Sequence, residues 1–169
     1  TPWLDSQRAI SPLVSVNNFL LDGTLCENEV TVPNGITAIC GGAFANCTAM
    51  TSVIIPNSVD TIGEYAFSGC ERLETVEIPN SLRNIGIGAF EFTPWLEAEK
   101  AKNPLVIANN ILIDGTDCTG DISVPNGVSA IAEGAFYDCY SINSVILPTG
   151  IEKIPKWAFA NCSNLNSVI

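Results

Sequence analysis

A 23-residue repeat dominates this chain of 169 residues. An aliphatic residue followed by proline recurs at 23-residue intervals, at Val32-Pro33, Ile55-Pro56 and Ile78-Pro79, and then at Val124-Pro125 and Leu147-Pro148. The pair Ala-Phe recurs five times in one phase, with its aromatic ring at Phe44, Phe67, Phe90, Phe136 and Phe159. One short repeat cannot bury its own apolar side. Successive copies must therefore stack into a solenoid with a shared core.

A longer period is superimposed on the first. Residues 1–77 match residues 93–169 at an offset of 92, which is four times 23, and 35 of the 77 aligned positions are identical. The stretch 93–121 thus replaces about one repeat without changing the phase. We divide the chain into an insert-type unit (1–29), three repeats (30–92), a second insert-type unit (93–121) and two repeats (122–169). We expect 1–169 to be a single solenoid and a fragment of a longer array, whose open ends associate end to end.

The pattern within one repeat predicts its local structure. An inward–outward–inward triplet precedes each proline, which predicts short parallel strands at or near 30–32, 53–55, 76–78, 122–124 and 145–147. Residues 64–67 (Glu-Tyr-Ala-Phe) are typical of one short helical turn with Ala66 and Phe67 facing the core. The five repeated phenylalanines should therefore be buried and stacked along one line. The expected fold class is an α/β repeat, with strands on one face and short helical turns on the other.

The insert-type units have a pattern of their own. Thr93 and Pro94 are an N-cap and a first helical residue, and they predict a short helix that Pro104 ends. The segments 105–108 and 111–113 then predict a β-hairpin around Asn109-Asn110. The segments 13–16 and 19–21 predict the same hairpin in the first unit. Trp3 and Trp95 are equivalent, and two interpretations stay open: capping of the solenoid, which we favour, or exposed stacking on a sugar.

These residues carry a resemblance to a known family. The consensus Ile-Pro-x-Ser/Gly-Val-x-x-Ile-Gly-x-x-Ala-Phe-x-x-Cys-x-x-Leu-x-x-Val resembles the BspA-like leucine-rich repeats over essentially the whole chain. The Thr-Pro-Trp-Leu and Asp-Gly segments resemble inserts that recur in that family. The resemblance implies a curved leucine-rich repeat solenoid of a bacterial secreted or cell-surface protein, with its parallel strands on the concave face. It implies adhesion or partner binding without naming one ligand.

Seven cysteines follow the repeat closely. Cys47, Cys70, Cys139 and Cys162 share one phase, Cys26 and Cys118 share another, and Cys40 stands alone. We expect the four in the first set to be free, buried thiols, because equivalent side chains of stacked repeats point in parallel and suit a ladder better than a disulfide. A disulfide set or a metal site is the alternative. No Cys-x-x-Cys motif occurs, which weakens the metal interpretation.

Composition excludes several classes of function. The chain has 7 Lys and Arg against 18 Asp and Glu, a net charge of −11, so it lacks the basic face that nucleic acid or an anionic membrane requires. It contains no histidine, which removes Ser-His-Asp and Cys-His catalysis and histidine zinc sites. No apolar run approaches the ~18 residues of a membrane helix, and we expect no membrane insertion.

Two weaker motifs are candidate sites. Asp114, Asp117 and Asp121 carry oxygen ligands suited to calcium, but their spacing differs from an Asp-x-Asp-x-Asp-Gly loop and favours an ordinary turn. Gly86-Ile87-Gly88 is a fragment of a phosphate-binding motif at a place where the repeat already requires small residues. We therefore expect no catalytic residues, no metal and no cofactor.

The surface of the strands remains as the candidate site. The outward strand positions on the expected concave face are Thr31, Ile54, Glu77, Ser123 and Ile146. Ile54 and Ile146 are 92 residues apart, and each either anchors a partner or packs on a neighbouring strand residue. We expect a non-enzymatic binding module that contacts a protein or a glycan through the concave face and the insert loops. The alternatives are a structural spacer and an accessory module of an extracellular polysaccharide-degrading complex.

Overall fold

The computed structural model describes residues 1–169, in two compact units, Thr1–Glu97 and Ala98–Ile169. The first unit contains α1 (Pro2–Arg8), β1 (Val14–Val16), β2 (Phe19–Asp22), β3 (Asn28–Thr31), β4 (Ala38–Ile39), β5 (Met50–Ile54), β6 (Thr61–Ile62), β7 (Thr75–Glu77) and β8 (Asn84–Ile85). Helix α2 (Pro94–Lys102) contains the boundary. The second unit contains β9 (Val106–Ala108), β10 (Ile111–Asp114), β11 (Gly120–Ser123), β12 (Ala130–Ile131), β13 (Ile142–Ile146) and β14 (Ser167–Val168).

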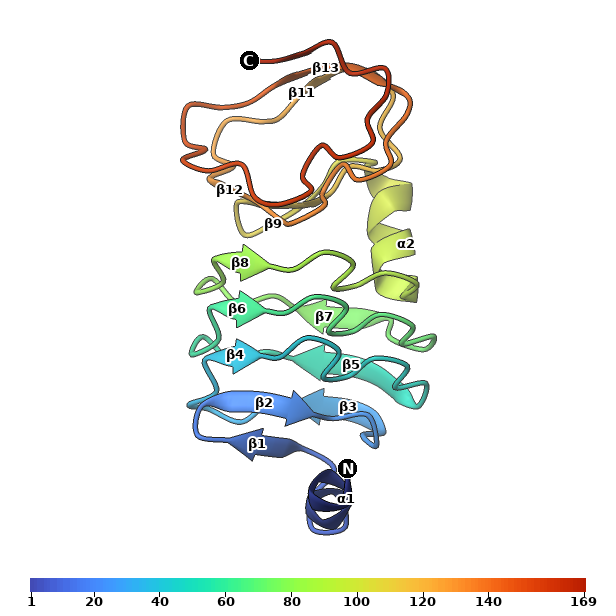
Figure 1. The fold of residues 1–169 in the computed structure, drawn as a ribbon, viewed down its shortest axis with the longest axis vertical. Coiled ribbons are helices and arrows are strands. Elements are labelled where there is room, and N and C mark those ends of the chain that lie inside the picture. Colours follow the sequence, from blue (N-terminus) through green and yellow to red (C-terminus); the bar gives the residue numbers. More distant parts are fainter. The chain divides into compact units, whose positions relative to one another are not determined.

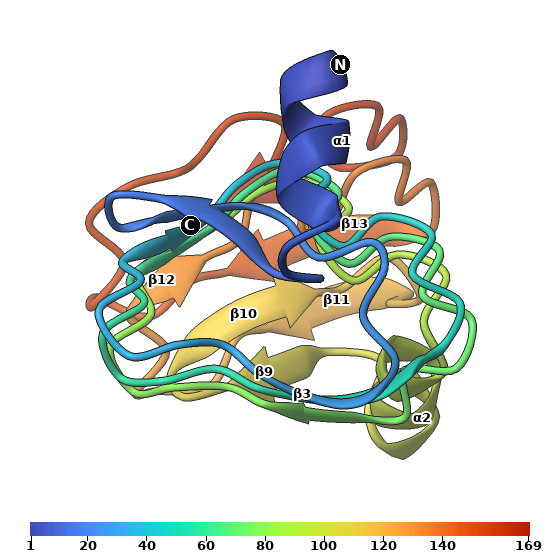
Figure 2. The same ribbon diagram turned by 90° about the horizontal axis from the view of Figure 1, so that it is seen from below.

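In the first unit the chain coils so that equivalent strands lie side by side. One sheet has the order β1-β2-β4-β6-β8 and the other has the order β3-β5-β7, as the two columns of strands in Figure 1 show. All pairs are parallel except the β1–β2 hairpin, and Val30, Val53 and Val76 stand in register at 23-residue intervals. Seen in Figure 2, successive turns of this unit follow the same outline.

The second unit repeats this arrangement in two three-stranded sheets, β12-β10-β9 and β11-β13-β14. The five predicted strands are confirmed in both units, and each ends one residue before its predicted end. The residue before the proline still forms a backbone hydrogen bond to the next strand. The Val32 N–H, for example, donates to the Ile54 carbonyl at 3.0 Å. The predicted hairpins are confirmed as well, with Asn109 and Asn110 in the left-handed conformation that a two-residue turn requires.

The repeated phenylalanines form the centre of each core. In the first unit the rings of Phe44 and Phe67 stack at 4.9 Å, and those of Phe67 and Phe90 at 5.3 Å. In the second unit Phe136 stacks on Phe159 at 5.2 Å. The first four rings are buried as predicted, whereas Phe159 is only half-buried because it lies in the last turn and no further turn covers it.

The stretch that leads into each phenylalanine is a series of β-turns and not the helical turn that the sequence suggested. Left-handed residues occur twice in each stretch, four residues apart, as at Gly42 and Asn46 or at Tyr65 and Gly69. A left-handed residue interrupts a right-handed helix, so each stretch closes as separate turns. The turns are joined across the stack by backbone hydrogen bonds, such as that from the Phe67 N–H to the Ala89 carbonyl at 2.8 Å.

Helices α1 and α2 have the predicted start. The Thr93 hydroxyl accepts from the Leu96 N–H at 3.2 Å, and Thr1 caps α1 in the same way. Neither helix is long and apolar enough to cross a lipid bilayer.

All seven cysteines are free thiols. Cys47, Cys70 and Cys139 are buried as predicted, and Cys162 of the last turn is half-buried. Their sulfurs donate to backbone carbonyls of the preceding turn, as from Cys47 to the Cys26 carbonyl and from Cys70 to the Phe44 carbonyl, both at 3.0 Å. Burial raises the pKa of Cys26 and Cys118 to about 11 and that of Cys70 to about 12. A buried thiol with a raised pKa is a poor nucleophile.

We therefore expect these thiols to be protected in the native protein. Cys26, Cys70 and Cys118 should not react with an aromatic disulfide reagent at pH 8, while all seven cysteines should react after denaturation. Each folded-state pKa lies above the unfolded value, so each protonated thiol stabilises the fold below about pH 8.5, and this contribution is lost as the pH rises towards 11. The melting temperature should fall over that range. A native mass lower by the hydrogens of a disulfide would contradict the prediction.

Candidate binding surface

The outward strand residues predicted as the site form one row in each unit. In the first unit the parallel register places Thr31 beside Ile54, and Ile54 beside Glu77. Thr31 and Glu77 are exposed and Ile54 is half-buried between them. In the second unit Ser123 pairs with Ile146, and both are exposed. The structure therefore brings the first three together on one sheet and the last two together on another.

Sequence reasoning missed a second outward row. Glu29, Ser52 and Thr75 are also paired across β3, β5 and β7, two residues before the first row. We call these two rows together the sheet face: Glu29, Ser52, Thr75, Thr31, Ile54 and Glu77. The alternation of a strand has a period of two and would have found this row, had it been extended by one step.

The sheet face is polar and acidic around one aliphatic side chain. Glu29 and Glu77 take part in no ion pair, and the neighbouring Glu74 is likewise unpaired and exposed. In the second unit the corresponding row begins with Asp121, whose carboxylate accepts a hydrogen bond of 2.6 Å from Ser144 on the next strand. Free carboxylates on a strand surface favour a partner that brings positive charge or hydroxyl donors.

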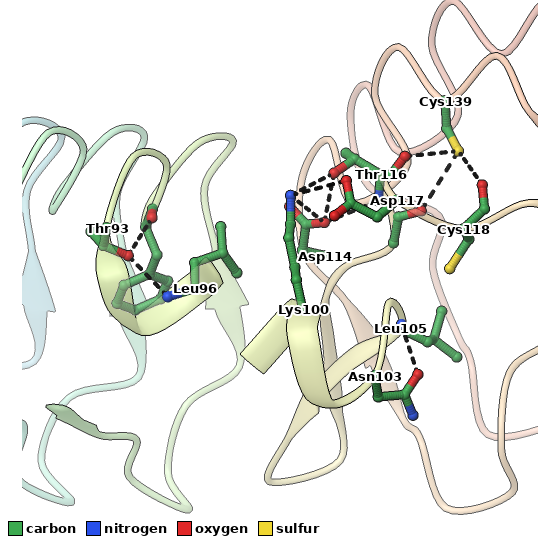
Figure 3. Close-up of polar contacts among 12 residues, drawn as sticks. Thr93, Leu96, Lys100, Asn103, Leu105, Asp114, Thr116, Asp117, Cys118 and Cys139 are labelled. Atoms are coloured by element: carbon green, nitrogen blue, oxygen red, sulfur yellow. Dashed lines mark hydrogen bonds and ion pairs between the residues drawn. The ribbon is translucent and has the colours of Figure 1, made fainter. Parts of the chain in front are cut away.

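The three aspartates weighed as calcium ligands have other partners. Lys100 Nζ of α2 lies 3.4 Å from Asp114 Oδ1, 3.6 Å from Asp117 and 2.9 Å from the Thr116 hydroxyl (Figure 3). Asp121 points instead to Ser144 on the sheet. Lys100 of the same chain therefore supplies the positive charge beside Asp114 and Asp117. This contact ties the end of α2 to the Asp-Gly-Thr turn.

The first unit has the equivalent contact, with Arg8 where the second has Lys100. Arg8 pairs with Asp22, and its Nη2 lies 3.0 Å from the Thr24 hydroxyl. Burial opposes ionisation of Asp22, but the hydrogen bonds from Arg8 and Thr24 outweigh it and hold the pKa of this carboxyl below its ordinary value. Both contacts were missed from the sequence, although the 92-residue offset aligns Arg8 with Lys100 and Asp22 with Asp114.

The two equivalent tryptophans differ in their surroundings. The indole ring of Trp95 is buried and packs against Phe90 at 4.7 Å with an interplanar angle of 58°. The backbone N–H of Trp95 donates to the Leu73 carbonyl at 2.8 Å. Trp95 therefore covers the end of the phenylalanine stack, which confirms the capping interpretation at this position. Trp3 is about half exposed.

Stacked 23-residue turns, parallel strands and an aromatic core define a leucine-rich repeat solenoid. Comparison with known families identifies the BspA type leucine rich repeat region over residues 14–113 and 115–169, in six copies. The chain belongs to this family.

Solved structures of bacterial leucine-rich repeat proteins are similar to it. The leucine rich repeat protein TpLRR of T. pallidum matches with a TM-score of 0.53 and 26% identity over 89% of this chain and 72% of its own. A leucine rich cell surface protein from Faecalibacterium prausnitzii matches with a TM-score of 0.48 and 26% identity, over 89% of this chain and 34% of its own. One from Bacteroides ovatus matches with a TM-score of 0.42 and 21% identity, over 90% and 48%. No curated protein sequence matches the chain.

Proposed function

We propose that this chain is a non-enzymatic binding module of a bacterial secreted or cell-surface protein. It contacts a protein or a glycan through the sheet face of the first unit, and the row of Ser123 and Ile146 is the equivalent surface of the second unit. Membership in the BspA-type family supports the location and the general role. The absence of histidine from the sequence supports the non-enzymatic assignment.

One observation carries the proposal: the row of Thr31, Ile54 and Glu77 differs in chemistry from strand to strand, although the residues beneath it repeat. Val30, Val53 and Val76 face inward at the neighbouring position of the same strands. The inward position is therefore valine on all three strands. The outer row, in contrast, presents a hydroxyl, an aliphatic group and a carboxylate on neighbouring strands. Such a mixed surface suits recognition of a shaped partner better than it suits packing.

Ile54 has the role of an anchor within this surface. It is the one aliphatic side chain on the sheet face and is flanked on both sides by polar residues of the same row. Apolar contacts at the centre of a polar rim carry much of the energy of protein interfaces. The unpaired Glu29 and Glu77 at the edges then select the partner by charge.

Binding of the full chain to panels of immobilised glycans and extracellular proteins tests this proposal. We expect saturable binding to at least one class, weakened about tenfold or more by Ile54→Asp and by Glu77→Lys. Glu152→Lys is the matched control, because Glu152 is exposed and lies outside the strands. Equal binding by all three variants, with unchanged melting temperatures, would place the contact elsewhere.

A structural spacer is the second candidate. The continuous backbone ladder between turns, which makes each unit a regular stack, favours it. A spacer has no saturable ligand, so the same binding panels separate the two functions. An accessory role in a polysaccharide-degrading complex would appear as binding to the polysaccharide alone.

A further inference from the structure

Three large side chains occupy a backbone conformation that such residues normally avoid. Ten residues other than glycine have a positive φ, and seven of these are Asn or Asp, which tolerate it. The other three are all aromatic: Tyr65 (φ 54°), Phe92 (φ 58°) and Trp157 (φ 61°). Other repeats place glycine at the position of Tyr65 and Trp157, namely Gly42, Gly88 and Gly134.

None of the three side chains belongs to the core. Tyr65 is 44% exposed, Phe92 71% and Trp157 58%. A left-handed conformation costs free energy for any residue with a Cβ atom, and glycine would relieve it at no loss to the core. Backbone strain at a residue outside the core indicates a function of the side chain itself.

In the first unit the ring of Tyr65 lies beside a free carboxylate. A methyl group built on Gly88 would lie 2.6 Å from Tyr65 Cδ1 and 3.1 Å from Glu91 Oε2, so the ring and the carboxylate meet above the same glycine. Phe92 follows Glu91 directly. The Glu91 carboxylate is half-buried and takes part in no ion pair or hydrogen bond of the structure, and the Tyr65 hydroxyl is also without a partner.

We propose that Tyr65, Glu91 and Phe92, here called the turn surface, bind an arginine or lysine side chain of a partner protein. The exposed ring faces of Tyr65 and Phe92 attract a cation, and a guanidinium group stacked on Tyr65 can pair with Glu91. Glu64, exposed and next to Tyr65, adds negative charge. A chain with a net charge of −11 also attracts a basic segment over a distance.

The turn surface is independent of the sheet face. Its residues belong to the turn stretches 64–69 and 87–92 and not to β3, β5 or β7. A partner bound here leaves Thr31, Ile54 and Glu77 free. The two proposals can therefore fail separately.

The test is a titration of the isotope-labelled full chain with the peptide acetyl-Gly-Arg-Gly-Arg-Gly-amide, followed by NMR. We expect saturable shifts of backbone amides in 64–69 and 87–92. Glu91→Gln and Tyr65→Gly should each weaken binding about threefold or more. Glu133→Gln, at the repeat position of Glu64 in the second unit, is the matched control and should leave it unchanged.

Two further outcomes would overturn the proposal. The first is a fall of more than about 5 °C in the melting temperature of Tyr65→Gly, because the ring would then be a packing element. The second is binding of a neutral oligosaccharide at these turns with full affinity retained by Glu91→Gln, because a sugar does not require the charge. Loss of peptide binding at 0.5 M salt would support the ion pair with Glu91.

Discussion

Replacement of Phe67 by alanine should cost about 3–5 kcal/mol of the free energy of unfolding. The ring of Phe67 is fully buried and lies between two others, with Phe44 at 4.9 Å on one side and Phe90 at 5.3 Å on the other. Its removal leaves a cavity that the rigid backbone ladders on both sides prevent from closing. Denaturant unfolding of the variant and the parent chain measures the difference.

Phe159→Ala is the matched control for this substitution. Phe159 occupies the same repeat position but packs against one ring, that of Phe136, and is half-buried. We expect its loss to cost clearly less, about 1–2 kcal/mol. A loss below about 1 kcal/mol for Phe67→Ala, or equal losses for the two variants, would show that the stack is not the source of stability.

Gly86→Ala should destabilise the first unit by about 2–4 kcal/mol, although it adds only one methyl group. That methyl would lie 2.7 Å from the carbonyl carbon of Gly63 and 2.8 Å from the Cα of Glu64, both backbone atoms of the preceding turn. Backbone held in a hydrogen-bonded ladder cannot move aside as a flexible side chain can. Gly86 has no positive φ, so the demand for glycine here is one of space and not of conformation. Thermal unfolding followed by circular dichroism checks the result.

The control lies at the same repeat position in another turn. Cys40 stands there in the first 23-residue repeat, where a side chain is accommodated and half-buried. Cys40→Ala should therefore change the free energy of unfolding by less than about 1 kcal/mol. If Gly86→Ala is as mild as Cys40→Ala, the turns are free to separate and the close contact does not limit stacking.

The repeat predicted those features that depend on periodicity. The register of Val30, Val53 and Val76 and the stacking of Phe44, Phe67 and Phe90 follow from a 23-residue phase, because equivalent residues of stacked turns must lie side by side. The sequence also predicted that Trp95 caps the solenoid, but it did not predict that the indole covers the ring of Phe90. The five outward residues were placed correctly on the strands, and their role in binding stays a prediction.

Features that depend on backbone conformation were out of reach. The residues 64–67 have the composition of a helical turn, but Tyr65 is left-handed, and a tyrosine gives no local signal of a positive φ. Only its alignment with Gly42 and Gly88 would have indicated the turn. The contact of Lys100 with Asp114 depends on how a helix returns to a loop 14 residues later, which no short motif encodes.

The separation of core and surface positions along the repeat has a consequence for sequence change. The groups that hold a turn in place are the inward valine, the Ala-Phe pair and the thiol, while Thr31, Ile54 and Glu77 form the outward row of the strands and are exposed or half-buried. Mutations in the second set therefore have little effect on folding. During evolution the outward residue of one strand can therefore change while the fold is kept. The outward residues of neighbouring strands are about 4.8 Å apart. The fold is in this sense a display framework, and combinatorial libraries at positions 31, 54 and 77 should yield folded proteins with new specificities.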